Sequence, residues 1–166
     1  MKTQKKRRRE GKTNYKKRIA LLKSGLPRIV FRKTNRYILS QYITSKEAQD
    51  KVIENITSKK LLDYGWPENK EGSLNSIPAS YLTGFLFGKI IQKKKLKTPI
   101  LDPGMVRIIY GNKFFSFIKG LKESGVEVKC DEKSFPSEER VRGKHLKEDF
   151  SETFEKIKSK IEKELK

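Results

Sequence analysis

The alternation of apolar and polar residues predicts β-strands in the first third of the chain. Residues 28–33 and 36–44 are rich in β-branched and aromatic side chains, and the short turn at Thr34–Asn35 between them predicts a β-hairpin. Residues 51–57 predict a third strand, and the apolar run 98–102 predicts a further, buried one. Both faces of the hairpin strands contain apolar residues, so we expect a sheet that is covered at least partly on both sides.

Apolar residues at helical spacing predict four helices around these strands. The first is expected to end before Gly25, and the second carries a stripe of small residues that would allow another backbone to approach closely. That stripe consists of Ser80, Gly84 and Gly88. The last predicted helix is amphipathic. The four helices begin near Thr13 or Asn14, Pro78, Asn112 and Asp149.

The first predicted strands follow one another directly, and the later ones alternate with helices. This order predicts an α/β domain with a mixed sheet. Two more short strands are expected at residues 106–110 and 126–128. The strand order cannot be read from the pattern. We expect a basic, extended arm at residues 1–12, the α/β domain at residues 13–146, and a C-terminal amphipathic helix at residues 147–166. That helix would either pack on the domain or bind a neighbouring protein or RNA.

Positive charge is concentrated at the N-terminus. The chain has 40 Lys and Arg residues against 20 Asp and Glu residues, which gives a net charge of +20. Residues 1–36 hold 15 basic residues and one acid, Glu10, for a net charge of +14, so the rest of the chain carries only +6. Such a block is typical of a protein that binds a polyanion, because charge that serves solubility would be spread over the surface.

Nucleic acid fits this block better than a membrane surface does. The arm from Lys2 to Lys12 contains no Leu, Ile, Phe or Trp that could insert into lipid, and no apolar run approaches the roughly 20 residues of a membrane span. No zinc-finger spacing, leucine-zipper repeat or helix-turn-helix pattern is present, so structured RNA is favoured over DNA. Tyr15, Tyr37 and Tyr42 are expected to pack in the core or the sheet, although stacking on bases stays open.

The residues predict neither an enzyme nor a bound cofactor or metal. His145 is the only histidine, so no His-based catalytic pair can form. Cys130 is the only cysteine, and its acidic neighbours disfavour a thiolate. Asp102 ends an apolar strand, but it is expected to be a turn or cap residue. Two alternatives remain: an RNA-processing enzyme, which would need further carboxylates converging on a metal, and a DNA-architectural protein, which would bind duplex DNA equally well.

Five stretches of the chain follow one another in an order typical of a known family. They are RRREGKTNYKKRIALLKSGLPRIVFRKTNRYILSQ (7–41), YGW (64–66), PASYLTGFLFGK (78–89), ILDPG (100–104) and FPSEERVRGKHL (135–146). Through these stretches the chain resembles the archaeal and eukaryotic-type branch of the large-subunit ribosomal protein eighteen family. Each stretch alone is weak evidence for the family, but together the stretches are highly specific and cover most of residues 7–146.

The resemblance implies a structural protein of the large ribosomal subunit, located in the cytoplasm. It implies binding to 5S rRNA, attachment of that RNA to the large-subunit (23S-type) rRNA in the central protuberance, and contact with neighbouring proteins, including the other 5S-binding protein, of family five. It also implies a three-layer α/β fold with helices on both faces of the sheet, related in topology to ribonuclease H but without catalytic carboxylates.

The family's RNA contacts map mostly onto the arm, the first helix and the hairpin, with a second region in the polar loop before the long helix and in residues 140–145. The RNA-binding residues predicted in this way are Arg7, Arg8, Arg9, Lys12, Asn14, Tyr15, Lys16, Lys17, Arg18, Arg28, Arg32, Lys33, Asn35, Arg36, Gln41, Arg140, Arg142, Lys144 and His145.

Overall fold

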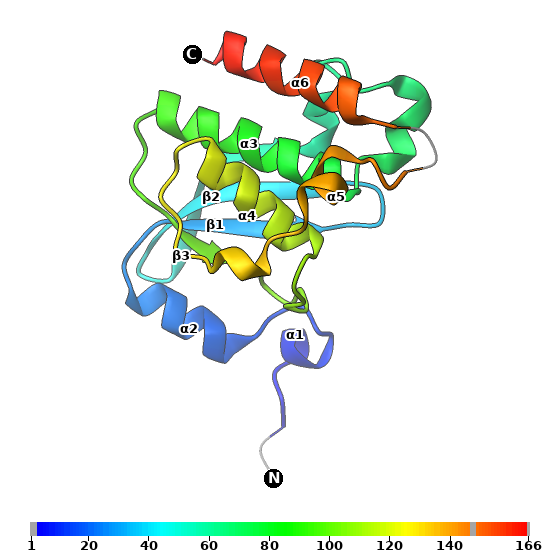
Figure 1. Cartoon of the computed structure of the whole chain (residues 1–166). Coiled ribbons are helices and arrows are strands. Elements are labelled where there is room, and N and C mark those ends of the chain that lie inside the picture. The colour runs from blue at the N-terminus through cyan, green and yellow to red at the C-terminus, as the bar shows by residue number, and fades with distance from the viewer. Residues whose placement is uncertain (1–2, 147–148, 166) are drawn as a thin grey trace.

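A four-stranded mixed sheet forms the centre of the protein. The computed structural model describes residues 3–146 and 149–165 (Figure 1). Strands β1 (Arg28–Lys33), β2 (Ile38–Lys46) and β3 (Gln49–Thr57) are antiparallel, and β4 (Ile100–Asp102) pairs in parallel with β1. The strand order is β3-β2-β1-β4. The predicted α/β class with a mixed sheet is confirmed, while the relation to ribonuclease H stays a prediction.

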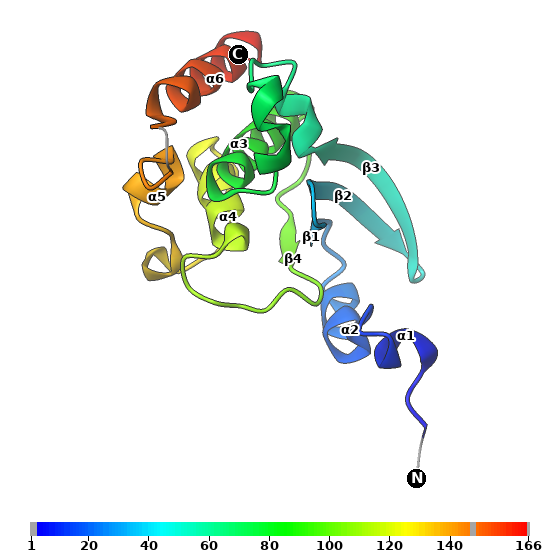
Figure 2. The same cartoon turned by 90° about the vertical axis from the view of Figure 1, so that its right-hand side faces the viewer.

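Helices lie on both faces of this sheet (Figures 1 and 2). On one face, the ring of Phe31 from β1 packs against Phe114 and Phe117 of α4, with ring centroids 5.4 and 5.2 Å away. The opposite face of β1 carries Arg28 and is approached by α2. The α-helices are α1 (Lys6–Arg9), α2 (Tyr15–Lys23), α3 (Ile77–Lys93), α4 (Lys113–Glu123), α5 (Glu138–Arg142) and α6 (Ser151–Glu164). The 3-10 helices are η1 (Ser58–Leu61), η2 (Glu68–Ser73) and η3 (Glu132–Ser134).

Side-chain caps fix where three of the helices begin. The Asn14 side chain accepts a hydrogen bond from the backbone N–H of Lys17 at the start of α2. Ser76 and Asn112 cap α3 and α4 in the same way. These caps satisfy backbone donors that the first helical turn leaves unpaired. The predicted starts near Asn14, Pro78 and Asn112 are therefore confirmed to within a few residues.

Helices α3 and α4 pack backbone against backbone through small residues. A Cβ added to Gly84 of α3 would collide with the carbonyl oxygen of Phe117, and one added to Gly120 of α4 would collide with that of Tyr81. Ser116 of α4 donates a hydrogen bond to the carbonyl oxygen of Ile77 at 2.9 Å. The close approach predicted from the stripe of small residues is confirmed, and α4 is its partner.

The C-terminal helix packs on its own domain. Phe154, Ile157 and Ile161 of α6 are buried in the same core as the sheet and α3, and the Phe154 ring lies 5.2 Å from that of Tyr81. The ring of Phe150, just before α6, lies 4.7 Å from Trp66. The helix therefore forms a further layer outside α3 (Figure 1). Of the two alternatives for this helix, packing on the domain is confirmed.

Several local predictions are wrong. Residues 106–110 form no strand, because Val106 bonds back to Pro103 in a turn and the following residues run as a loop. Residues 126–128 form no strand either. The N–H of Val126 bonds to the Leu121 carbonyl, and with Gly125 in the left-handed region this ends α4 in a Schellman-type turn. The hairpin turn lies at residues 35–36, one position later than expected.

The arm is not extended throughout. Residues Lys6–Arg9 form one helical turn, closed by backbone bonds from Gly11 to Arg8 and from Lys12 to Arg7. The Nε of Arg7 also donates to the Thr13 hydroxyl at 3.0 Å. Local hydrogen bonds thus outweigh the repulsion among adjacent cations that favoured an extended chain.

No helix in the described part of the chain has the length and apolar character that crossing a membrane requires.

Replacing Gly84 by alanine should destabilise the protein, although alanine is the better helix former. The new methyl group would collide with backbone of α4, and overpacking of this kind costs about 1–3 kcal/mol. Urea unfolding should show this loss for Gly84→Ala. A matched control is Gly72→Ala in η2, where a Cβ meets nothing within 4 Å and little change is expected. Equal stability of the two variants would contradict the packing described for α3 and α4.

Candidate nucleic-acid interface

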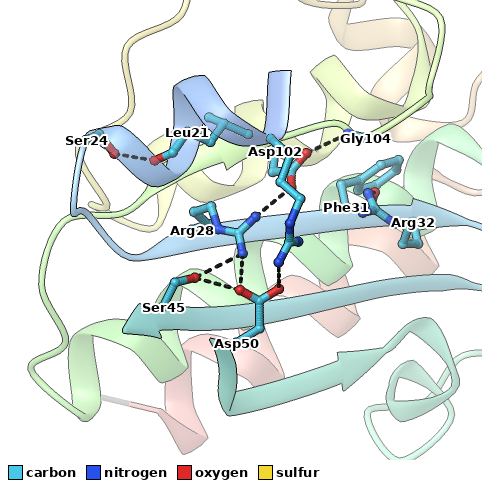
Figure 3. Close-up of polar contacts among 10 residues, drawn as sticks. Leu21, Ser24, Arg28, Phe31, Arg32, Ser45, Asp50, Asp102 and Gly104 are labelled. Carbon is cyan, nitrogen blue, oxygen red and sulfur yellow. Dashed lines mark hydrogen bonds and ion pairs between the residues drawn. The ribbon is translucent and has the colours of Figure 1, made fainter. Parts of the chain in front are cut away.

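A buried ion-pair network ties the N-terminal part of the chain to the sheet (Figure 3). Arg28 of β1 is only 1% exposed. Its guanidinium lies 2.7 Å from the Asp50 carboxylate of β3 and 3.3 Å from the Asp102 carboxylate of β4, and it donates to the Ser45 hydroxyl of β2 at 3.1 Å. All four strands therefore contribute to the surroundings of one charge, as buried charges require partners.

The same network holds α2 against the sheet. Arg18 of α2 pairs with the second oxygen of Asp50 at 2.9 Å. Burial alone would raise the pKa of the Asp50 carboxyl. Hydrogen bonds from Ser45 and Arg18, with the positive charges of Arg28 and Arg18, outweigh this effect and hold the pKa below its ordinary value. Asp50 is thus ionised at neutral pH and clamps two arginines at once.

The network gives both Arg28 and Asp102 structural roles. Arg28 is buried and paired, so we remove it from the predicted RNA contacts. Asp102 is a turn residue, as expected: its Oδ1 accepts from the Gly104 N–H at 2.8 Å, while its other oxygen pairs with Arg28. The two carboxylates that converge here, Asp50 and Asp102, converge on a guanidinium. Within residues 3–146 and 149–165, no group of three or more His, Cys, Asp or Glu side chains could hold a metal ion.

Beside this network lies a cleft of about 850 Å³ that five separate segments enclose. They are the arm, the end of β1, the start of α3, the loop between β4 and α4 with the first turn of α4, and α5. In Figure 2 that loop runs between the N-terminal helices and the helical layer of α4. The basic residues that line the cleft are Arg7, Lys12, Arg32, Lys33, Arg107, Lys113 and Arg140. We call it the basic cleft.

Positive charge in the basic cleft is largely uncompensated. None of the described residues that line it is acidic. Glu10, close by in the arm, pairs with Lys12 at 2.8 Å. Burial, followed by the charge of neighbouring Lys33, lowers the pKa of Lys113 below its ordinary value. The cleft therefore favours an anionic partner, which would restore the balance of charge.

Five predicted RNA contacts meet in the basic cleft: Arg7, Lys12, Arg32, Lys33 and Arg140. A smaller hollow next to it, between α1, α2 and Arg32, is lined by three more, Asn14, Lys17 and Arg18. Sequence reasoning missed Arg107 and Lys113. Arg107 lies in the residues predicted to be a strand, and its position as a cation between Val106 and Ile108 was the one signal that could have marked it.

Other predicted contacts lie on the exposed surface outside the basic cleft. Arg8, Arg9 and Lys16 are exposed on α1 and α2, and Asn35 and Arg36 are exposed at the hairpin tip. Lys144 and His145 are exposed after α5. Gln41 is half-buried in β2, and Tyr15 is half-buried with the Lys5 amino group 4.8 Å above its ring. Arg142 turns the other way, toward Glu138 and Glu155 at 3.8 and 3.6 Å.

The polar loop before α3, which belongs to the second predicted contact region, lies next to the hairpin tip. The Asn75 amide donates to the carbonyl oxygens of Thr34 at 2.8 Å and Asn35 at 3.1 Å. The Tyr37 hydroxyl donates to Glu71 at 3.1 Å. The prediction that Tyr37 packs in the sheet holds in part, since its ring is half-buried, and Tyr42 is fully buried in the core.

Cys130 is not poised as a nucleophile. Burial and the nearby Asp131 carboxylate raise the pKa of its thiol, in spite of the opposing charge of Lys122. The raised pKa disfavours a thiolate, and Asp131 contributes to it as expected, although burial is the larger cause.

The chain is similar to known ribosomal proteins. A family model described as ribosomal large subunit proteins 60S L5 and 50S L18 matches residues 1–99. Large ribosomal subunit protein uL18 of Korarchaeum cryptofilum is 43% identical over 140 residues, which make up 84% of this chain and 70% of that protein. The uL18 of Methanoculleus marisnigri is 39% identical over 96% of this chain and 93% of its own length, and that of Methanoregula boonei is 36% identical over 96% and 92%.

Replacing Asp50 by asparagine should destabilise the protein by about 2–3 kcal/mol at neutral pH. Breaking a buried ion pair costs roughly 3–5 kcal/mol, but here Arg28 keeps Asp102 and asparagine keeps one acceptor oxygen. Urea unfolding measures the loss. Glu138→Gln, which removes an exposed ion pair with Arg142, is the control and should leave the stability unchanged within error.

The same variant should change how stability depends on pH. Because the pKa of Asp50 is lower in the folded protein, its contribution is fully present above the ordinary value of 3.8 and is lost as pH falls through the folded pKa. The stability difference between the wild type and Asp50→Asn should therefore shrink below that pH. A difference that stays constant down to the acid transition would show that the Asp50 charge contributes nothing.

Proposed function

The chain belongs to the uL18 family of large ribosomal subunit proteins, and on that premise we propose that it binds 5S rRNA and helps to attach it to the large-subunit rRNA in the central protuberance. Its role in the large subunit is structural, it is not an enzyme, and it acts in the cytoplasm. One observation supports the RNA-binding part most: basic residues from five segments of the chain gather around one cleft that no described acidic residue lines.

Phosphate neutralisation supplies most of the binding energy in this proposal. Residues 1–36 carry +14, and α1, α2 and the hairpin tip leave most of these cations exposed. Each phosphate contact releases counterions, which makes such binding strong and dependent on salt. Arginine adds planar contacts to phosphates and base edges, so Arg7, Arg8, Arg9 and Arg36 would also orient the RNA.

Shape selects the RNA in this proposal. The arm contributes to the basic cleft, while the hairpin tip and the loop at Asn75 lie together outside it, and such a divided surface suits an irregular RNA better than a uniform duplex. The arm at residues 1–12 acts as a separate RNA-binding segment that orders further on the RNA, and residues 13–146 form the domain that receives 5S rRNA. The remaining surface contacts the 23S-type rRNA and neighbouring proteins, including the 5S-binding protein of family five.

Removing three arginines of the arm should reduce the salt dependence of 5S rRNA binding. We expect the variant Arg7→Gln/Arg8→Gln/Arg9→Gln to lower the slope of log K against log salt by about 2–3, because each phosphate contact contributes about 0.7–0.9. The measurement is a salt titration of binding to labelled 5S rRNA with tRNA as competitor.

A matched control removes the same charge at the other end of the molecule. Lys156→Gln/Lys160→Gln/Lys163→Gln lies on α6, which Figure 1 shows far from α1, and should leave the slope unchanged. Equal effects of the two variants would mean that only net charge matters. If tRNA or duplex DNA competes as well as 5S rRNA does with the wild type, the 5S proposal is wrong and a general nucleic-acid binder remains.

A further inference from the structure

The basic cleft has an apolar interior, which phosphate binding alone does not require. Its inner wall is formed by Phe31, Ile77 and Phe114, all part of the buried core. Nearer the solvent lie Met105 and Ile109, which are 45% and 53% exposed. Apolar surface in water at the mouth of a cleft costs free energy unless a partner covers it.

The wall of the cleft contains an arginine held in place. The guanidinium of Arg32 donates to the carbonyl oxygen of Phe31 at 2.9 Å and packs against the backbone of Gly104. A Cβ at Gly104 would collide with this guanidinium, and Gly104 also has a positive φ of 61°, which favours glycine. Arg32 therefore presents a planar cation in one orientation, as stacking on a base or bidentate binding requires.

Size and charge together favour an unpaired nucleotide as the occupant. The volume of about 850 Å³ falls in the range of roughly 300–1,000 Å³ of clefts that enclose small organic groups. A paired base hides its faces within the duplex, whereas an unpaired base offers an apolar face and brings a phosphate with it. Such a nucleotide matches apolar walls that are rimmed by cations such as Arg107 and Arg140.

We infer that the basic cleft receives one or two unpaired nucleotides of the bound RNA, with the bases against Met105, Ile109 and the inner wall and the phosphates against the surrounding cations. The inference rests on the proposed function, because it takes RNA to be the partner. It goes beyond that function by assigning a site for bases to a surface otherwise described by charge alone.

Removing the apolar rim without changing any charge tests this site. The variant Met105→Ser/Ile109→Ser should weaken 5S rRNA binding by about tenfold, which corresponds to the contribution of one stacked base, and should leave the salt slope unchanged. The matched control is Val52→Ser/Ile53→Ser in β3, two residues that are 46% and 39% exposed outside the cleft. Wild-type affinity of the cleft variant would overturn the inference.

A photoreactive side chain identifies the occupant directly. With a benzophenone amino acid in place of Ile109 in the full chain, irradiation of the complex with 5S rRNA should crosslink one or two unpaired nucleotides. The same probe at Val52 should not. Crosslinks only to paired nucleotides would overturn the inference, and so would a crosslink to a protein in the assembled subunit.

A second RNA separates this inference from the 5S proposal. The Ile109 probe is irradiated with a plain RNA duplex and with the same duplex carrying a two-nucleotide bulge. Crosslinking that depends on the bulge supports the base site even if binding shows no preference for 5S rRNA. If 5S rRNA binds tightly and resists tRNA, but the probe crosslinks neither 5S rRNA nor the bulged duplex, the base site is overturned and the 5S proposal is left intact.

Discussion

The guanidinium of Arg28 is the contact on which the arrangement of the N-terminal half depends. It is almost fully buried, and a buried charge is tolerated only with partners in place. Its partners come from β3 and β4, on either side of the β1–β2 hairpin, so the charge is satisfied only when all four strands are assembled. The parallel pairing of β1 with β4 spans three residues, and the Arg28–Asp102 ion pair reinforces this short contact.

The same contact distinguishes the cations that stabilise the fold from those that remain available to bind a partner. Asp50 and Asp102 neutralise Arg28, and Asp50 also engages Arg18. Other acidic residues pair with Lys94, which follows α3, and with lysines of α4 and α6, away from the arm. Little negative charge is left for the arm, the hairpin tip and the basic cleft. Such self-repulsion destabilises the free protein, and a bound polyanion relieves it, so RNA binding and stability are linked.

Local sequence patterns were enough to predict the elements whose signals are local. The caps at Asn14 and Asn112, the small residues of α3 and the apolar stripe of α6 each act within one helix or its nearest neighbour, and each led to a correct prediction. The strands expected at residues 106–110 and 126–128 failed for a related reason. Apolar residues alone do not show whether a neighbouring strand exists to pair with. Here these residues belong to a turn and loop and to the end of a helix.

Residues whose role depends on distant partners could not be placed in this way. Arg28 and Arg32 share one face of a single strand and look equivalent in the sequence. Arg28, however, is paired with carboxylates 22 and 74 residues away, while Arg32 lines the basic cleft. Arg107 and Lys113 were missed because the cleft exists only once five segments have come together. The charge block correctly marked where cations are abundant, but only tertiary structure decides which of them face a partner.

Rigidity determines what each part of the surface can contribute to binding. Arg32 is held by a backbone oxygen and by Gly104, and α2 is clamped through Arg18, so ordering them on RNA costs little conformational entropy. Residues 3–12 of the arm have only local hydrogen bonds, and its helical turn has no buried residue, so ordering the arm costs more. Prepositioned groups around the cleft can therefore discriminate among RNA shapes, because they do not move to contact a nucleotide that is in the wrong place. The arm adapts to whatever backbone it meets and adds affinity with less selectivity.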